Sequence, residues 1–269
     1  MFGVLWSRKV ESQVADLPED FCVGLMKQAY VRFYAELNDF LPPERKARTT
    51  TCDFEVAGSV KDMIEAMGVP HTEADLILVN GEPVDFTYRL QHGDRVSVYP
   101  RFTSIDVSSL KHLRPESPRN LRFIADTHLG RLAAYLRMLG FDTLYRNDYR
   151  DQELAQLSAA EDRILLTRDR GLLKRTMVRW GCYLRATEPT QQLIEVLQQF
   201  ELRPAIAPFR RCMHCNALLR QTQKESISDR LLPETRKHFD DFYICPDCDR
   251  IYWKGSHYRR MQRLIDSVI

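Results

Sequence analysis

Two pairs of cysteines constrain the folding of this chain more than any other feature. Cys212 and Cys215 form one C-x-x-C unit, Cys245 and Cys248 form a second, and 29 residues lie between the two units. Each tight turn presents two thiolates, and four thiolates make a closed tetrahedral site for Zn²⁺. The spacing therefore predicts a structural zinc ribbon over residues 208–269, in which the metal adds folding energy to a module with a small core.

Composition places the chain among ordinary globular proteins. It has 269 residues, of which 44% are hydrophobic and 28% are charged. No apolar run approaches the ~18 residues of a membrane helix, and the first residues lack the core of a signal peptide. We therefore expect a cytoplasmic protein with no membrane partner, in which the cysteines stay reduced. Residues 1–25 carry no pattern that we can interpret.

Charge is distributed unevenly along the chain. The formal net charge of +2 divides into −5 over residues 1–118, +2 over 119–202 and +5 over 203–269. Two proline-containing segments, 101–120 and 203–210, separate these parts, and the first of them is predicted to be a linker. An acidic first part and a basic last part indicate a nucleic-acid partner.

The first part of the chain, residues 26–102, has the pattern of a mixed sheet crossed by one helix. Ser59 is the predicted N-cap of the helix, and Asn80-Gly81 is a hairpin turn. This order resembles the β-grasp (ubiquitin-like) fold, and the closing GDRVSVYP resembles the end of ThiS/MoaD sulfur carriers. Those carriers end in a free Gly-Gly, which is absent here, so we expect a binding or positioning role. Strands are predicted at 29–35, 50–56, 75–84 and 93–100, and the helix at 59–67.

The second part, residues 119–202, alternates strand and helix. Such alternation in about 80 residues predicts a small parallel sheet covered on both faces. Within the first helix, apolar residues from Leu129 to Leu139 share one face and Gly140 is the C-cap. Strands are predicted at 121–125, 141–145, 163–167 and 182–186, and helices at 128–139, 151–161, 170–177 and 189–200.

Acidic residues follow several of these strands. Asp126 comes directly after the first strand, Asp148 and Asp151 follow the second, and Asp169 follows the third. Because the carboxyl ends of parallel strands share one edge, we expect these carboxylates to converge there and to hold Mg²⁺ or Mn²⁺. Alternative roles are a helix N-cap for Asp126, Asp151 and Asp169 and a loop turn for Asp148.

The segments FIADTHLGRLAAYLRMLGFDTLYRND and RILLTRDRGLLKR give this part a specific resemblance. They resemble the Mut-seven C-terminal RNase family, a branch of the PIN-domain nucleases, which hydrolyse RNA with Mg²⁺ or Mn²⁺. The resemblance implies a PIN-like α/β fold, metal ligands at Asp126 and Asp169, and a turn shaped by Thr167. The acid of the middle helix is best matched by Asp151, with Asp148 or Glu153 as alternatives. It also implies that residues 26–102 are the ubiquitin-like domain often fused to this nuclease.

Basic residues lie near the acids and after the last cysteine. Arginine forms forked hydrogen bonds to phosphate, so we predict RNA contacts there, with a solvated helix face as the alternative. After Cys248, basic residues interleave with Tyr252, Trp253 and Tyr258, whose rings could stack on unpaired bases or form the core of the ribbon. We expect Trp253 in that core and the Arg259–Arg260 pair on RNA. The predicted RNA-binding residues are Arg131, Arg137, Arg168, Arg170, Lys174, Lys254, Arg259 and Arg260.

Two functions are compatible with these patterns. The first is a metal-dependent ribonuclease with Asp126, Asp148, Asp151 and Asp169 as candidate catalytic residues and a zinc ribbon that aids RNA binding. The second is a non-catalytic RNA-binding adaptor whose β-grasp domain docks a protein partner. The resemblance to PIN domains, which often form dimers, leaves a homodimer open. The predicted domains are 26–102, 119–202 and 208–269.

Overall fold

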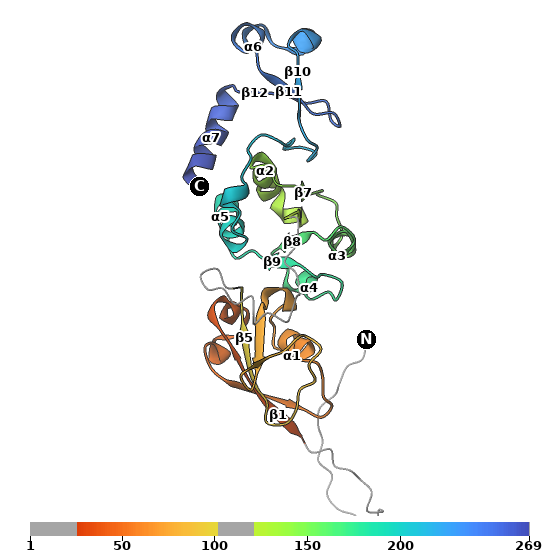
Figure 1. Ribbon diagram of the computed structural model, residues 1–269, viewed down its shortest axis with the longest axis vertical. Helices are drawn as coiled ribbons and strands as arrows, with labels where there is room; N and C mark the ends of the chain where they lie inside the picture. The colour runs from red at the N-terminus through yellow and green to blue at the C-terminus, as the bar shows by residue number, and fades with distance from the viewer. Residues whose placement is uncertain (1–25, 102–120, 269) are drawn as a thin grey trace, which may run out of the picture.

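The computed structural model describes residues 26–101 and 121–268, so residues 1–25 and the predicted linker over 102–120 lie outside the described residues. Three parts follow one another along the longest axis of the molecule: a mixed sheet, a parallel sheet and the cysteine module (Figure 1). None of the helices in the described part of the chain has the length and apolar character needed to cross a lipid bilayer.

The N-terminal part is a five-stranded mixed sheet with one α-helix, as predicted. The strand order is β2-β1-β5-β3-β4, with β1 and β5 parallel and the other neighbours antiparallel. Short 3₁₀ turns over Ala35–Phe40 and His71–Glu73 lie between the strands. The elements are β1 (Lys27–Phe33), β2 (Thr50–Phe54), α1 (Val60–Ala66), β3 (Leu76–Val79), β4 (Glu82–Pro83) and β5 (Arg95–Tyr99).

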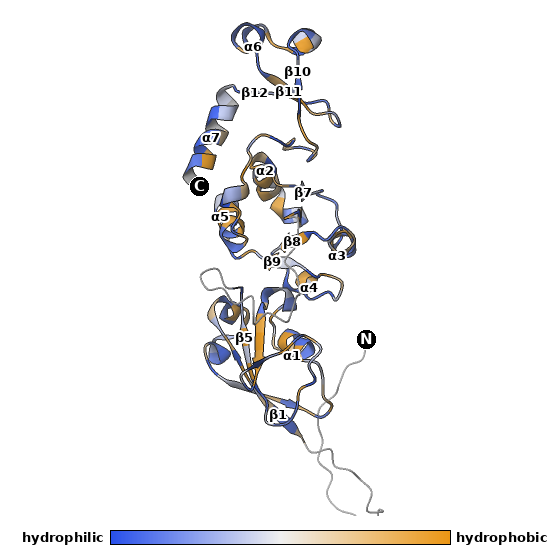
Figure 2. Ribbon diagram, viewed as in Figure 1, coloured by the Kyte–Doolittle hydropathy of each residue, from blue (hydrophilic) through white to orange (hydrophobic). Residues whose placement is uncertain are grey.

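Local sequence accounts for most of this part. Ser59 and Asp62 form a reciprocal capping box at the start of α1, which satisfies free N–H groups of the first turn. Asn80 and Gly81 both have positive φ, as a two-residue hairpin between β3 and β4 requires. The alternate residues of β1 face the core, where they meet the apolar side of α1; hydrophobic residues concentrate on α1 and on the strands beside it (Figure 2).

The central part is a four-stranded, wholly parallel sheet in the order β7-β6-β8-β9, which confirms the predicted architecture. Two apolar clusters cover its two faces. One packs Phe123, Ala125 and Leu166 against α2 and α5, and the other packs Ile124 and Leu165 against α3 and α4. The elements are β6 (Phe123–Ala125), α2 (Gly130–Met138), β7 (Thr143–Leu144), α3 (Asp151–Ala160), β8 (Ile164–Thr167), α4 (Arg170–Leu173), β9 (Gly181–Tyr183) and α5 (Pro189–Gln199).

The helix predicted over 170–177 is shorter than expected and ends at Leu173. The backbone N–H of Arg175 bonds to Leu172 O, and that of Val178 bonds to Arg175 O, so the chain leaves the helix in consecutive turns. These turns bury Val178 in the core and allow β9 to begin at Gly181. Tertiary packing of the returning strand therefore ends the helix, although the sequence favours its continuation.

The C-terminal part contains a three-stranded antiparallel sheet in the order β10-β11-β12, beside the four cysteines. A 3₁₀ turn (Glu225–Arg230) and α6 lie between the two cysteine pairs, which accounts for the long spacer between them. Ile227, Leu231 and Phe242 form its small core. The elements are β10 (Arg220–Thr222), α6 (Pro233–His238), β11 (Phe242–Ile244), β12 (Ile251–Trp253) and α7 (Ser256–Val268).

This module is joined to the central part on both of its flanks. The segment 203–210, predicted to divide the two parts, is packed: the N–H groups of Ala207 and Phe209 bond to carbonyls at the end of α2. On the other flank, α7 turns back, and Ile265 enters the core formed by α2 and α5 at 1% exposure. Trp253, predicted to be a core residue, is 37% exposed because Phe242 and its neighbours already fill the small core of the module.

Candidate active site and cysteine centre

Two acidic residues meet at the carboxyl edge of the parallel sheet. Asp126 follows β6 and continues its pairing, since its N–H donates to Leu166 O at 3.0 Å. Thr167, at the end of β8, joins the two acids: its Oγ1 donates to Asp126 Oδ2 at 2.6 Å and accepts from the Asp169 N–H at 2.9 Å. The parallel register of β6 and β8 thus places Asp126 and Asp169, which come from distant parts of the sequence, at the same edge of the sheet.

Each of these acids also begins a helical turn. Asp126 Oδ1 accepts from the N–H of Thr127, and Asp169 Oδ1 accepts from Gly171 N at 2.6 Å and from Leu172 N at 3.3 Å. Asp126 is buried at 8% exposure, whereas Asp169 is exposed. The N-cap bonds fix both side chains, so the edge carries one buried and one accessible carboxylate in defined orientations.

The other candidate acids make separate contacts. Asp148 forms a two-pronged ion pair with Arg146, at 2.9 Å and 2.6 Å, and these hydrogen bonds lower the pKa of Asp148. Asp151 begins α3 and lies 3.6 Å from the guanidinium of Arg175. Glu153 accepts from the backbone N–H that precedes α3. These three acids remain candidates for the middle position, and each contacts an arginine or the start of a helix.

The four cysteines form a ready metal centre. Sγ of Cys212 lies 3.5 Å from that of Cys248, and Sγ of Cys215 lies 3.3 Å from that of Cys245. Within residues 26–101 and 121–268, this is the one group of three or more potential metal ligands whose atoms all lie within 4.8 Å of one another. A tetrahedral Zn²⁺ with bonds of about 2.3 Å needs sulfurs about 3.8 Å apart, so the cluster fits zinc.

The acidic edge gathers fewer carboxylates than the sequence predicts. The predicted convergence of three or four carboxylates is not seen among the described residues, which bring together Asp126 and Asp169 but gather no acidic group of this kind. Asp148 and Asp151 lie instead beside exposed arginines, Arg146 and Arg175.

The two cysteine turns have the same backbone construction. Asn216 N donates to Cys212 O at 2.9 Å, and Asp249 N donates to Cys245 O at 3.0 Å, with positive φ at both Asn216 and Asp249. Burial opposes ionisation of Cys212, but hydrogen bonds from Tyr252 and from the turn outweigh it and lower the pKa of this thiol to about 6. Burial instead raises the pKa of Cys215, so within this turn the thiolate, the form that binds zinc, is favoured at Cys212 alone.

The cysteine centre and the acidic edge lie at opposite ends of the parallel sheet. Asn216 joins the first cysteine turn to the start of β7, because its Oδ1 accepts from Thr143 N at 3.0 Å and its Nδ2 donates to Asp142 Oδ1 at 2.8 Å. Asp142 also pairs with Arg163, which precedes β8, at 2.7 Å. These residues mark the amino ends of the strands, whereas Asp126 and Asp169 mark the carboxyl ends.

Comparison with known families agrees with this arrangement. A family model described as the Mut7-C RNAse domain matches residues 121–265, which is more than half of the chain. The chain belongs to the Mut7-C RNAse family. A second model, described as Mut7-C ubiquitin, matches residues 26–106, so the two domains occur in the predicted order. Neither the curated proteins nor the solved structures contained a match.

The Mut7-C RNAse match covers both the parallel sheet and the cysteine module. This agrees with Arg137, which joins the two: its Nε donates to Thr143 O at 2.8 Å, and its Nη1 donates to Met213 O at 3.1 Å and to His214 O at 2.7 Å. Arg137 is 3% exposed. The predicted RNA contact at this residue is therefore replaced by a buried structural one, because its guanidinium is already used to hold the first cysteine turn.

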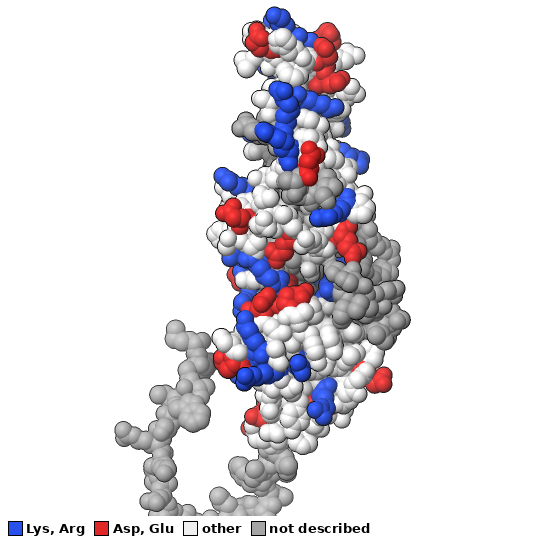
Figure 3. Space-filling model, turned by 90° about the vertical axis from the view of Figure 1, so that its left-hand side faces the viewer, with Lys and Arg blue, Asp and Glu red and all other residues white. Residues whose placement is uncertain are grey.

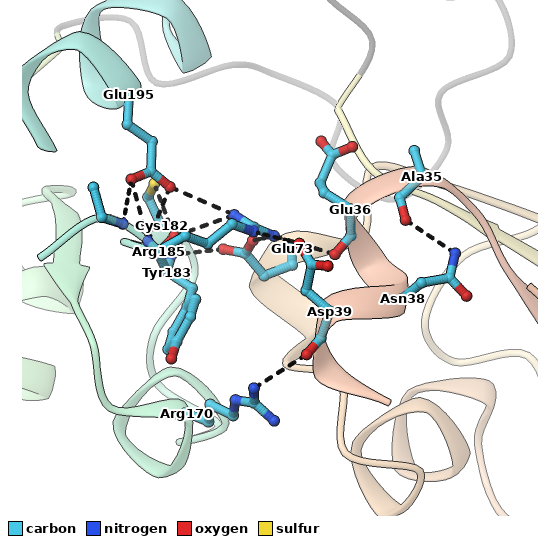
Figure 4. Close-up of polar contacts among 11 residues, drawn as sticks. Ala35, Glu36, Asn38, Asp39, Glu73, Arg170, Cys182, Tyr183, Arg185 and Glu195 are labelled. Carbon is cyan, nitrogen blue, oxygen red and sulfur yellow. Dashed lines mark hydrogen bonds and ion pairs between the residues drawn. The ribbon is translucent and has the colours of Figure 1, made fainter. Parts of the chain in front are cut away.

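Two further predicted RNA-binding residues contact the ubiquitin-like domain. The guanidinium of Arg170 donates to the carbonyls of Phe40 and Asp39 at 3.2 Å each, and its charge lies 4.9 Å from the centre of the Phe40 ring. Lys174 Nζ donates to Glu65 O at 2.7 Å. The ubiquitin-like domain thus occupies these two cations, and Figure 4 shows its Asp39 beside Arg170.

The centre of this contact consists of residues that we did not predict. Glu73, which is buried, accepts from the edge N–H of Tyr183 at 2.7 Å, and Arg185 lies 3.1 Å from Asp39 and 3.5 Å from Glu73 (Figure 4). Burial raises the pKa of Glu73 to about 7. Arg185 offered one signal, because it follows a strand at the same edge as the acids; Glu73 offered none, because docking alone buries it.

Arg131 and Arg168 remain exposed on the elements that carry the acids, and Lys254 and Arg259 are exposed in the C-terminal part. The side chain of Arg260 lies outside the described residues. These exposed cations are the ones whose predicted contact with RNA the structure leaves sterically open.

Proposed function

We propose that this Mut7-C RNAse protein is a divalent-metal-dependent ribonuclease that hydrolyses RNA phosphodiester bonds at the carboxyl edge of its parallel sheet. The observation that carries the proposal is the bridge through Thr167, which links the carboxylate of Asp126 to the backbone N–H of Asp169 at one edge of the sheet. The family match supports a nuclease, and the basic C-terminal part supports an RNA substrate.

The donor set suits a hard divalent cation. Mg²⁺ takes one or two carboxylates from a protein and fills its other positions with water and substrate phosphate, so the Asp126–Asp169 pair is sufficient. When bound, Mg²⁺ or Mn²⁺ would supply activated water and neutralise charge on the phosphate. Asp126 and Asp169 would present the oxygens; the bond from Thr167 orients the Asp126 carboxylate, and the N-cap bonds to Gly171 and Leu172 orient that of Asp169. Asp151 is proposed as the middle ligand, with Asp148 and Glu153 as alternatives.

The exposed arginines near this edge are proposed to hold the substrate. Arg131 lies on the first turn of α2, shortly after Asp126, and Arg168 separates Thr167 from Asp169. Guanidinium groups in these places can form paired hydrogen bonds to phosphate oxygens. The zinc ribbon is proposed to add contacts through Lys254 and Arg259.

The test compares Asp126→Asn and Asp169→Asn with the wild-type chain on labelled RNA, in the presence of Mg²⁺ or Mn²⁺. Asparagine retains an N-cap oxygen but not the charge, so we expect each change to reduce cleavage at least about 100-fold while the protein stays folded. Glu188→Gln is the matched control, because Glu188 is exposed and makes no side-chain cap bond at the start of α5. Cleavage at the wild-type rate by both Asp variants would refute this site.

One observation favours the alternative of a non-catalytic adaptor. Among the described residues no three carboxylates lie together, an arrangement that suits RNA binding without turnover. In that case the wild-type chain would bind RNA and leave it intact with either cation, and the ubiquitin-like domain would dock a protein partner. Turnover of RNA that depends on Asp126 would exclude this alternative.

A further inference from the structure

A groove with aromatic walls runs between the cysteine turns, β12 and the start of α7. Its volume is about 760 Å³, and Tyr252, Trp253 and Tyr258 line it together with Met213 and Met261. Sites for small organic ligands have volumes of about 300–1,000 Å³, so the groove can admit a nucleotide.

Two of the three aromatic rings are held rigidly. The hydroxyl of Tyr252 lies 3.1 Å from Sγ of Cys212, and the ring of Tyr258 packs on Phe209 with the ring centres 4.3 Å apart. Trp253 differs, since 37% of it is exposed. Its indole Nε1 would lie 2.7 Å from a Cβ at position 255, so Gly255 is what allows the indole to lie over the turn. An exposed indole beside two anchored rings is an arrangement that can accept a flat group.

Charged side chains of both signs line this groove. They are Arg230, Asp249 and Arg250, and Arg230 is paired with Asp249 at 3.1 Å. A second hollow begins at Ser256 and Tyr258, which both hollows share, and continues along α7 to Arg259 and Arg263. Figure 3, which faces the α7 side, shows Lys and Arg gathering at the level of β12 and the start of α7. The aromatic groove therefore opens onto a track of cations.

This groove is remote from the acidic edge. The cysteine turns dock at the amino ends of the strands through Asn216, whereas Asp126 and Asp169 lie at the carboxyl ends. A ligand that touches both must extend over at least the length of β8, which is about 13 Å for four residues. α7 runs from the groove back to the central part, where Ile265 is buried, so its cations mark a route between them.

We propose that this groove binds an unpaired base of single-stranded RNA, stacked on Trp253, while the adjoining phosphates contact Arg259 and Arg263. The proposal rests on the proposed ribonuclease function and gives it a second contact away from the cleavage site. Bases stack on exposed aromatic rings in single-strand-binding proteins, where cations follow the backbone. An acidic peptide would satisfy the cations but would leave the aromatic groove without a flat partner.

The binding test uses the full chain without added divalent ions and a labelled single-stranded RNA of about 16 nucleotides, within the range of known single-strand sites. We expect Trp253→Ala to weaken binding about 5- to 100-fold, the effect of losing one base–aromatic stack. Trp253→Phe should recover most of the affinity. The matched control is Tyr243→Ala, because Tyr243 is also exposed, at 36%, on the neighbouring strand β11 but does not line the groove.

Two further measurements separate stacking from a general loss of structure. A 2-aminopurine base in the RNA should be quenched on binding to the wild type and not on binding to Trp253→Ala, while the zinc content of both proteins stays equal. In cleavage assays with Mn²⁺, Trp253→Ala should slow the long RNA but not a dinucleotide, because the two bases of a dinucleotide lie closer together than the at least ~13 Å that separates the two sites.

The possible outcomes are distinct. Equal RNA affinity of Trp253→Ala and Tyr243→Ala would overturn the base site even if the enzyme cleaves RNA. Equal affinity for duplex RNA would also overturn it, since paired bases cannot enter the groove. Binding of polyglutamate that depends on Trp253 would assign the groove to an acidic protein partner instead. Failure of the ribonuclease function would show as tight, Trp253-dependent binding without cleavage.

Discussion

Replacing Arg137 by methionine tests whether this residue holds the cysteine centre or contacts RNA. In the structure its guanidinium donates to three carbonyls, those of Thr143, Met213 and His214, at 2.7–3.1 Å. Methionine fills much of the same volume but donates no hydrogen bond. Two of the orphaned carbonyls belong to the first cysteine turn, so the loss should reach the metal centre.

The magnitude follows from the number of bonds. A buried carbonyl that loses its donor costs about 1–3 kcal/mol, which gives an upper range well above 3 kcal/mol for three carbonyls. Burial disfavours the charged guanidinium and lowers the pKa of Arg137. Removing the charge therefore offsets part of the loss in the free energy of unfolding. We therefore expect a net loss of about 3–5 kcal/mol, the usual effect of removing one member of a buried charged network.

The assay combines chemical unfolding with the rate of zinc transfer to a coloured chelator. Arg137→Met should unfold at lower denaturant and release zinc faster than the wild type. Arg131→Met is the matched control: Arg131 lies on the same helix but is exposed, and its loss should change stability by less than about 0.5 kcal/mol. An Arg137→Met protein that keeps wild-type stability and zinc release but loses RNA affinity would refute the reasoning.

Three other changes test separate parts of the fold. Because burial raises the pKa of Glu73 to about 7, the folded chain binds a proton that the unfolded chain has lost, and stability should fall by about 3 kcal/mol as the pH rises from about 4.5 to 7. Glu73→Gln cannot ionise and should remove this fall; parallel melting profiles of both proteins at pH 5 and 8 would contradict it. Gly140→Ala should cost more than about 2 kcal/mol, since Gly140 has a φ of +97° and a Cβ there would overlap the Ala207 carbonyl; an unchanged melting temperature would argue against this packing. Ser59→Ala should cost about 1 kcal/mol by removing the capping box, as measured by denaturant unfolding, and no loss would show that the cap is dispensable.

Features set by neighbouring residues could be predicted from the sequence. The capping box at Ser59, the Asn80-Gly81 hairpin and the two cysteine turns depend on a few consecutive residues, and each has the predicted form. The end of α4 at Leu173 does not depend on neighbouring residues. It depends on the burial of Val178 in the core and on the start of β9.

The candidate active site was predictable in part. Asp126 and Asp169 directly follow or closely follow adjacent parallel strands, and parallel pairing alone brings such positions together. Asp148 and Asp151 lie in and after a loop, where side-chain partners decide the outcome, and each is held by an arginine. A strand end fixes where a residue lies, whereas a loop does not.

The arginines show most clearly which features the sequence predicts and which the tertiary structure decides. Sequence identifies Arg131 and Arg137 only as two cations on one helix, although Arg137 lies one helical turn after Ala133, on the apolar face, which was a usable signal. The tertiary structure exposes the first and buries the second against the cysteine turn. Arg170 and Lys174 are likewise held by tertiary contacts, because both donate hydrogen bonds to carbonyls of the ubiquitin-like domain.

By itself the sequence determined the order of the domains, the parallel sheet, the cysteine ligands and the two acids at the ends of neighbouring strands, because periodicity and short-range spacing specify these features. Only the tertiary structure decided which cations face solvent, that Glu73 is buried against β9, and that the cysteine centre and the acids occupy opposite ends of one sheet. Those outcomes depend on contacts between surfaces far apart in the chain, whose mutual burial no local pattern encodes.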